Sequence, residues 1–202
     1  MNLSVYVEEY LTDAINIINK IDKQSIVKTI EILINLKKNG GRLFILGVGG
    51  GAGHASHAVN DFRKIVGIES YSPSDNVSEL TARVNDDGWD SSYSRWLGIS
   101  KLGQNDVVFI ISVGGGNSEK KISNNLVESL KLAKERGSKI IGIVGRDGGY
   151  TAKVADAVVL VPVVSSHSIT PHTESFQAVI WHLIVSHPAL LENQMKWEST
   201  IR

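Results

Sequence analysis

His57 and Asp61 have side chains that could do chemistry, and they lie four positions apart after a run of glycines. On a helix this spacing places both side chains on one face, as a pair of metal ligands requires. The same spacing is typical of a surface ion pair or of a hydrogen bond along one helix face. The pair alone therefore does not distinguish a metal site from a structural contact.

Glu174 and His182 form a second candidate pair, on a segment with helical periodicity. Their separation of eight residues corresponds to ~12 Å along a helix axis and ~80° of rotation. The two side chains are therefore poorly placed to share one ion unless the start of the helix bends inward. His182 also follows Trp181 and precedes Leu183, and a buried, hydrogen-bonded histidine is common in such an apolar setting.

Two glycine-rich segments, Gly47–Gly53 and Ser112–Ser118, each follow a short apolar run. Backbone amides at the start of a helix form an anion site when no Cβ shields them. The second segment adds Asn117 and two serine hydroxyls. Tight turns would explain either segment without a ligand, and neither segment continues into the Gly-Lys-Ser/Thr of a P-loop. Two such loops facing one crevice predict a site for a phosphate carried by a small organic group.

The first glycine segment also matches the dinucleotide pattern Gly-x-Gly-x-x-Gly/Ala at Gly47, Gly49 and Ala52, and Asp75 could then hold a ribose. A lone match to this pattern is weak evidence. In addition, about 40 residues with helical character precede the first expected strand, whereas the dinucleotide motif belongs to a strand–turn–helix unit. We therefore expect no nucleotide cofactor.

Apolar runs and helical periods alternate along the chain. We expect strands over residues 42–48, 70–74, 106–113, 139–145 and 157–163, and helices within 3–38, after the first glycine segment, and over 76–84, 90–100, 119–136 and 173–187. This alternation predicts an α/β fold with a doubly wound parallel sheet, helices on both faces and two N-terminal helices. Ligands of such sheets bind outside the carboxyl ends of the strands, where both glycine segments would lie.

The composition excludes several classes of function. The chain has 202 residues, 21 Lys+Arg against 21 Asp+Glu, 19 glycines and no cysteine. Without cysteine, disulfides, thiol catalysis and thiolate metal sites are excluded. A net charge of zero gives no attraction to nucleic acid or to an anionic membrane, and no apolar run approaches the ~20 residues that span a bilayer. We expect a cytoplasmic protein of one domain over 1–202, with N-terminal helices (1–38), a core (39–188) and a tail (189–202).

Five short motifs occur in the order and nearly the spacing of one known family. They are Gly47-Val48-Gly49-Gly50-Gly51 followed by His57 and Asp61, then Asn85-Asp86, then Ser112-Val113-Gly114-Gly115-Gly116-Asn117-Ser118, then Gly145-Arg146-Asp147-Gly148-Gly149, and finally Glu174 with His182. Through these motifs the chain resembles the phosphoheptose isomerases of the sugar isomerase (SIS) domain families. It departs from their pattern at Val48 (Asn in the family), Gly51 (Ser), Asp61 (Glu) and Glu174 (Gln), and its second loop lacks the middle serine and has one residue more.

The resemblance implies an aldose–ketose isomerase that converts sedoheptulose 7-phosphate to a heptose 7-phosphate through a cis-enediol. It assigns acid–base roles to Asp61 and His182. It implies metal ligation by His57, Asp61, Glu174 and His182, which are imidazole and carboxylate donors that suit zinc. It places substrate contacts at Gly49, Gly50, Gly51, Asn85, Asp86, Ser112, Gly114, Gly115, Gly116, Asn117 and Ser118.

The resemblance also implies a homotetramer in which the N-terminal helices form the contact. The competing interpretation is a non-catalytic SIS module that binds a sugar phosphate or a protein partner. The serines missing from the glycine loops favour this alternative, and the four metal-type side chains oppose it.

Overall fold

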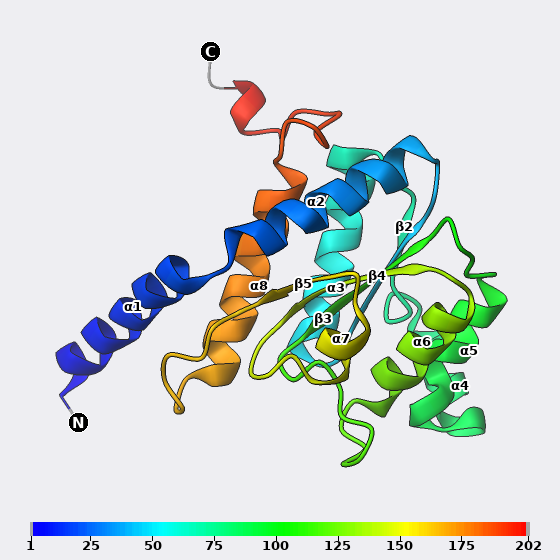
Figure 1. The fold of residues 1–202 in the computed structure, drawn as a ribbon, viewed down its shortest axis with the longest axis horizontal. Coiled ribbons are helices and arrows are strands. Elements are labelled where there is room, and N and C mark those ends of the chain that lie inside the picture. The colour runs from blue at the N-terminus through cyan, green and yellow to red at the C-terminus, as the bar shows by residue number, and fades with distance from the viewer. Residues whose placement is uncertain (1, 201–202) are drawn as a thin grey trace.

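The computed structural model describes residues 2–200 and is built around a five-stranded sheet (Figure 1). The strands are β1 (Leu43–Gly47), β2 (Ser70–Tyr71), β3 (Val107–Ser112), β4 (Lys139–Val144) and β5 (Ala157–Leu160). Their order is β2-β1-β3-β4-β5, and every pair is parallel. The predicted α/β fold with a doubly wound parallel sheet is therefore confirmed.

Helices cover both faces of this sheet. They are α1 (Leu3–Lys20), α2 (Lys23–Lys38), α3 (Gly50–Asp61), α4 (Val77–Asp87), α5 (Trp89–Ile99), α6 (Asn124–Glu135), α7 (Gly149–Val154) and α8 (Ile169–Val185), with a π-helical turn η1 (Phe62–Val66) and a 3₁₀ turn η2 (Glu198–Thr200). Successive strand residues point to opposite faces. Leu43 and Ile45 pack with α2, α3 and α8, whereas Phe44 and Leu46 pack with α5 and α6.

The observed elements differ from the expected ones mainly at their ends. The helix expected over 119–136 begins only at Asn124, because residues 117–122 form a tight hairpin in which Asn117 and Ile122 exchange backbone hydrogen bonds of 2.9 and 3.1 Å. The last long helix begins at Ile169 rather than at residue 173, and β2 has only two residues. The sequence patterns predicted neither η1 nor α7.

The helix α1 projects beyond the rest of the molecule, as Figure 1 shows. Ile17, near its end, is its only fully buried residue. Tyr10 stacks on the ring of His172 of α8, with ring centroids 4.1 Å apart. In contrast, α2 buries Ile30 and Leu33 in the core, so it belongs to the body of the fold. None of the helices between residues 2 and 200 has the length and apolarity needed to cross a bilayer.

Candidate active site

The two glycine segments meet at the carboxyl edge of the sheet, where the strand order reverses. The neighbours of β1 are β2 on one side and β3 on the other, so the crevice of this fold opens between the ends of β1 and β3. The first turn of α3 lies directly against the end of β3, since a Cβ on Gly51 would overlap the carbonyl oxygen of Ile111. Glycine is required here for this close approach of the backbones.

A cavity of about 600 Å³ opens at this edge of the sheet. Its walls come from the ends of β1, β3 and β4 and from the segment that enters α8. Of the predicted substrate contacts, Ser112, Gly114, Gly116 and Asn117 line this cavity, while Ser118 lines a smaller neighbouring one. The volume lies within the range of roughly 300–1,000 Å³ that is typical of small-molecule sites.

The floor of the cavity is made by two loops whose backbones pack directly on each other. A Cβ on Gly115 would overlap the carbonyl oxygen of Gly148, and a Cβ on Gly149 would overlap that of Gly114. Tyr150 and Thr151 also donate backbone hydrogen bonds of 2.8 and 2.9 Å to carbonyl oxygens of the second glycine segment. The predicted contact at Gly115 is therefore a buried spacer beneath the cavity wall.

Other predicted substrate contacts lie outside the lining of the cavity. Gly49, Gly50 and Gly51 form the start of α3, and of the first glycine segment only Val48 faces the cavity. Asn85 and Asp86 are exposed on the last turn of α4, where the Asn85 amide donates a 2.7 Å hydrogen bond to Asp86. Asn117 does line the cavity, but its Oδ1 accepts a 2.8 Å bond from the Lys120 amide.

Three of the four predicted metal ligands converge on the adjoining faces of α3 and α8. The Nε2 atoms of His57 and His182 each lie 3.8 Å from Oδ2 of Asp61, and one donor atom from each residue falls within 4.8 Å of the other two. The Asp61 side chain is 11% exposed, whereas both imidazoles are about half exposed. A buried carboxylate is thus open to a ligand from the side of the two rings.

Hydrogen bonding sets the tautomer of His182. Its Nδ1 lies 2.8 Å from the carbonyl oxygen of Ala178 and must donate, because a carbonyl can only accept. In the neutral ring Nε2 then carries a lone pair, which faces the carboxylate oxygen of Asp61. Two acceptors that face each other are stabilised by a cation between them. A backbone carbonyl bound to the remote ring nitrogen is also the usual outer partner of a metal-bound histidine.

Zinc fits this donor set. Two zinc–ligand bonds of about 2.0–2.2 Å at a tetrahedral angle separate their donor atoms by about 3.4 Å, close to the two 3.8 Å separations. Trp181 fixes both rings, because it stacks on His182 with centroids 3.5 Å apart and meets the His57 ring edge-on at 4.8 Å. The fourth position of such a site would remain open, as in catalytic zinc centres.

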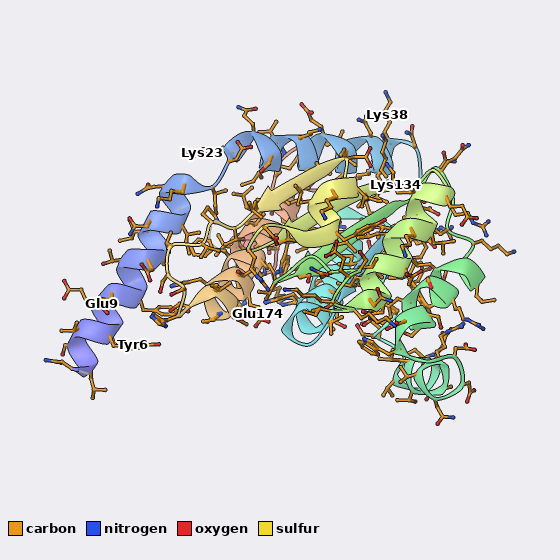
Figure 2. All side chains as sticks on the ribbon, turned by 60° about the horizontal axis from the view of Figure 1, so that its bottom comes forward. Tyr6, Glu9, Lys23, Lys38, Lys134 and Glu174 are labelled. Atoms are coloured by element: carbon orange, nitrogen blue, oxygen red, sulfur yellow. The ribbon has the colours of Figure 1, made fainter. Side chains whose placement is uncertain are left out.

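Glu174, the fourth predicted ligand, lies outside this group. It is on α8 beside the start of α3, and a Cβ on Gly50 would lie 2.5 Å from its Oε1 (Figure 2). The helices α3 and α8 pack side by side, so Glu174 is level with Gly50, and His182 is level with Asp61 two turns further on. The eight-residue spacing indicated this separation, and the start of α8 does not bend to close it.

His54 is a site residue that the sequence analysis missed. Burial lowers the pKa of its imidazole, although the nearby carboxylate of Glu174 acts in the opposite direction, and His57 and His182 add to the lowering. His54 therefore lies near Glu174, His57 and His182, with its imidazole favoured in the neutral form. Its position four residues after Gly50 and three before His57 is the signal that could have identified it.

Tyr93 of α5 supports the first glycine segment from below. Its buried hydroxyl donates a 2.9 Å hydrogen bond to the carbonyl oxygen of Gly47. Burial raises the pKa of Tyr93 to about 12, so the hydroxyl remains a donor at all physiological pH values. Nothing in the spacing of Tyr93 indicated this role.

Comparison with known proteins assigns the chain to a family. The model of the SIS domain matches residues 9–145. The chain belongs to the SIS domain family. The curated relatives of this SIS chain include a phosphoheptose isomerase of Sulfurimonas denitrificans, which is 32% identical over 174 residues, 84% of this chain and 81% of the relative.

Solved structures agree with this assignment to the SIS fold. A phosphoheptose isomerase from Neisseria gonorrhoeae gives a TM-score of 0.78 at 25% identity and covers 91% of this chain and 98% of its own. A phosphoheptose isomerase from Francisella tularensis gives a TM-score of 0.76 at 17% identity, with 92% and 97% covered. At 17% identity, this second similarity supports the shared fold and nothing more.

Proposed function

We propose that this SIS chain is a ketose–aldose isomerase of a sugar phosphate, and that it interconverts sedoheptulose 7-phosphate and a heptose 7-phosphate through a cis-enediol. The observation that carries the proposal is the convergence of His57, Asp61 and His182 on two helices that both begin at the cavity. A module that only bound a sugar phosphate would have no use for such a group of acid–base and metal-type side chains. The relatives named phosphoheptose isomerase support the choice of substrate.

The distance between the cavity and the catalytic group suits an extended substrate. His57 lies seven residues and Asp61 eleven residues beyond Gly50, which corresponds to roughly 10 and 16 Å along α3. A single small ion or a short sugar could not touch both places. A linear sugar whose phosphate and carbonyl lie at opposite ends can place its phosphate in the glycine-lined cavity and extend its carbonyl end along α3 toward His57.

In this proposal Asp61 and His182 move the protons. Starting from the ketose, Asp61 takes a proton from C1 and returns it to C2, the carbonyl carbon, while His182 in its protonated form gives a proton to the C2 oxygen and takes one back from the C1 hydroxyl. The burial of Asp61 keeps water from competing for its carboxylate. When zinc is bound by His57, Asp61 and His182, the ion would supply Lewis-acid polarisation of the substrate carbonyl in place of the proton from His182, whose Nε2 would then be a ligand.

Carbon-resolved NMR of ketose phosphates with five to seven carbons, incubated with the protein, tests this proposal. We expect exchange of the carbonyl between the first two carbons, fastest for the seven-carbon substrate. Saturable binding of these sugar phosphates without any such exchange would contradict the proposal and favour the non-catalytic module.

Zinc content is a separate prediction. Protein purified without chelator or affinity tag should contain zinc by elemental mass spectrometry, and His57→Ala or His182→Ala should weaken zinc binding by at least about 100-fold because each removes a donor atom. His187→Ala is the matched control, since this histidine lies outside the group of donors. Protein that binds no zinc even at saturating zinc would overturn the metal assignment.

We also propose that α1 assembles the chain into a homotetramer. Large apolar side chains stand exposed along this helix, namely Leu3, Val5, Tyr6, Val7, Leu11, Ile15 and Ile18. Contiguous exposed apolar surface of this kind marks a contact with another protein surface. In Figure 2 the labelled residues Tyr6 and Glu9 lie on the part of α1 that extends past the body.

Sedimentation velocity tests the tetramer. Leu11 and Ile15 are both 59% exposed and lie four residues apart on one face of α1. The double variant Leu11→Arg/Ile15→Arg should sediment as a smaller species than the wild type, because two buried cations would disrupt the contact. Lys28→Glu, on the exposed side of α2, should leave the assembly unchanged. A double variant of unchanged size would refute the role of α1.

A further inference from the structure

Two cations stand on the rim of the 600 Å³ cavity, and the proposed chemistry does not use them. Lys120 belongs to the hairpin that follows β3, and Arg146 belongs to the turn that follows β4. Both side chains are exposed, and neither forms an ion pair with any residue between 2 and 200. The one acidic residue that lines the same cavity is Asp147, whose carboxylate accepts a 3.2 Å bond from the Gly149 amide.

The backbone holds Arg146 on this rim in a conformation that favours glycine. Its φ is 54°, and the turn around it is closed by a 2.9 Å hydrogen bond from the Gly148 amide to the Gly145 carbonyl. A non-glycine residue in the left-handed region is uncommon and strained, and such residues cluster at functional sites. Glycine would adopt this backbone conformation more easily, but the chain has an arginine here, and its guanidinium lies at the mouth of the cavity.

Hydrogen bonds of the hairpin also fix the backbone at Lys120. The Oδ1 of Asn117 accepts a 2.8 Å bond from the Lys120 amide, and the backbone bridge between Asn117 and Ile122 closes the hairpin. Asn117 therefore fixes the loop that carries Lys120. The two cations come from different strand connections, and the cavity lies between these connections.

Apart from Lys120 and Arg146, the residues that line the cavity offer an anion backbone amides, the hydroxyls of Ser112, Ser123, Ser166 and Thr170, and the imidazole of His167. The whole chain has no net charge that could attract a phosphate dianion. Guanidinium groups bind phosphate through two parallel hydrogen bonds, and an ammonium group binds it as a point charge. The two cations thus supply the charge that the floor lacks.

We propose that Lys120 and Arg146 bind the phosphate of the substrate and make the site selective for phosphorylated over unphosphorylated sugars. This inference rests on the proposed function, which takes the ligand to be a sugar phosphate. In this arrangement the glycine amides orient the phosphate oxygens, while the two cations supply most of the affinity and its dependence on salt.

Calorimetric titration with inorganic phosphate tests the inference without any isomerase activity. The double variant Lys120→Gln/Arg146→Gln should bind phosphate at least about 10-fold more weakly than the wild type, because each removed cation loses a charge-assisted hydrogen bond. Wild-type affinity should fall with added sodium chloride, and the affinity of the double variant should be nearly insensitive to it. Lys134→Gln on α6, away from the cavity lining, is the control for the loss of one charge.

Arg146→Gly separates binding from folding. Because glycine adopts the left-handed conformation freely, this variant should melt at the same temperature as the wild type or higher, and should still bind phosphate more weakly. Titrations with sedoheptulose 7-phosphate and with sedoheptulose should show that only the phosphorylated sugar loses affinity in the double variant. Phosphate affinity within twofold of the wild type in the double variant would overturn the inference. Phosphate binding without sugar isomerisation would instead overturn the proposed function alone.

Discussion

Replacing Asp61 by asparagine is expected to lower kcat/KM for the sugar phosphate by about 10²–10⁴-fold, the usual contribution of a general base. The amide has nearly the same size, so the packing of α3 against α8 should remain. However, the amide neither accepts the substrate proton nor faces the imidazoles of His57 and His182 as an anion. Carbonyl exchange measured by NMR, with circular dichroism to check the fold, gives the result directly.

Two further variants give this experiment its controls. Asp156→Asn also removes one carboxylate, but at the amino end of β5, where Asp156 pairs with Lys139 at 2.7 Å. It should leave kcat/KM within about twofold of the wild type, since surface ion pairs contribute little. Asp61→Glu keeps the charge with a longer side chain, and should retain more activity than Asp61→Asn. An Asp61→Asn protein as active as the wild type would remove Asp61 from the mechanism.

Replacing Gly149 by alanine is expected to destabilise the fold by about 2–4 kcal/mol, from overpacking and backbone strain together. The new Cβ would overlap the carbonyl oxygens of Gly114 and Gly116, neither of which can move as a flexible side chain can. The φ of Gly149 is also 53°, in the left-handed region. The free energy of unfolding in urea measures the effect.

The helical glycine Gly98 is the matched control for this substitution. It lies on α5, and no atom would lie within 4 Å of an added Cβ. Gly98→Ala should be neutral or stabilising by up to about 1 kcal/mol, because alanine is the better helix former. Equal stability of the two variants would show that the loops after β3 and β4 are not packed as the structure describes.

The sheet could be predicted from the sequence because buried parallel strands consist of short runs of consecutive apolar residues. Val107–Ser112 and Lys139–Val144 are buried along nearly their whole length, and glycines mark where β1, β3 and β4 end. The prediction of a helix over residues 119–122 is wrong for a local reason. The Asn117 side chain binds the Lys120 amide, a hydrogen bond that competes with helix formation and that helical periodicity does not reveal.

The catalytic group could be proposed only through the resemblance. The spacing of His57 and Asp61 predicts one helix face, but the approach of His182 depends on α8 packing beside α3 after 120 intervening residues. The same tertiary packing separates Glu174 from the group and brings His54 toward Glu174. The pairing of Lys120 with Arg146 could not be predicted from any one motif, because two separate loops must fold before these residues share a cavity.

The projecting helix α1 has a thermodynamic consequence. It has 18 residues, of which only Ile17 is fully buried, and helices in proteins draw most of their stability from tertiary packing. In the proposed tetramer, the surfaces of neighbouring subunits would supply the free energy that keeps its first turns ordered. In that tetramer, the order of α1 would depend on protein concentration by mass action, whereas the order of the sheet would not. On dilution, α1 would lose its order at protein concentrations at which the sheet and the cavity are still folded.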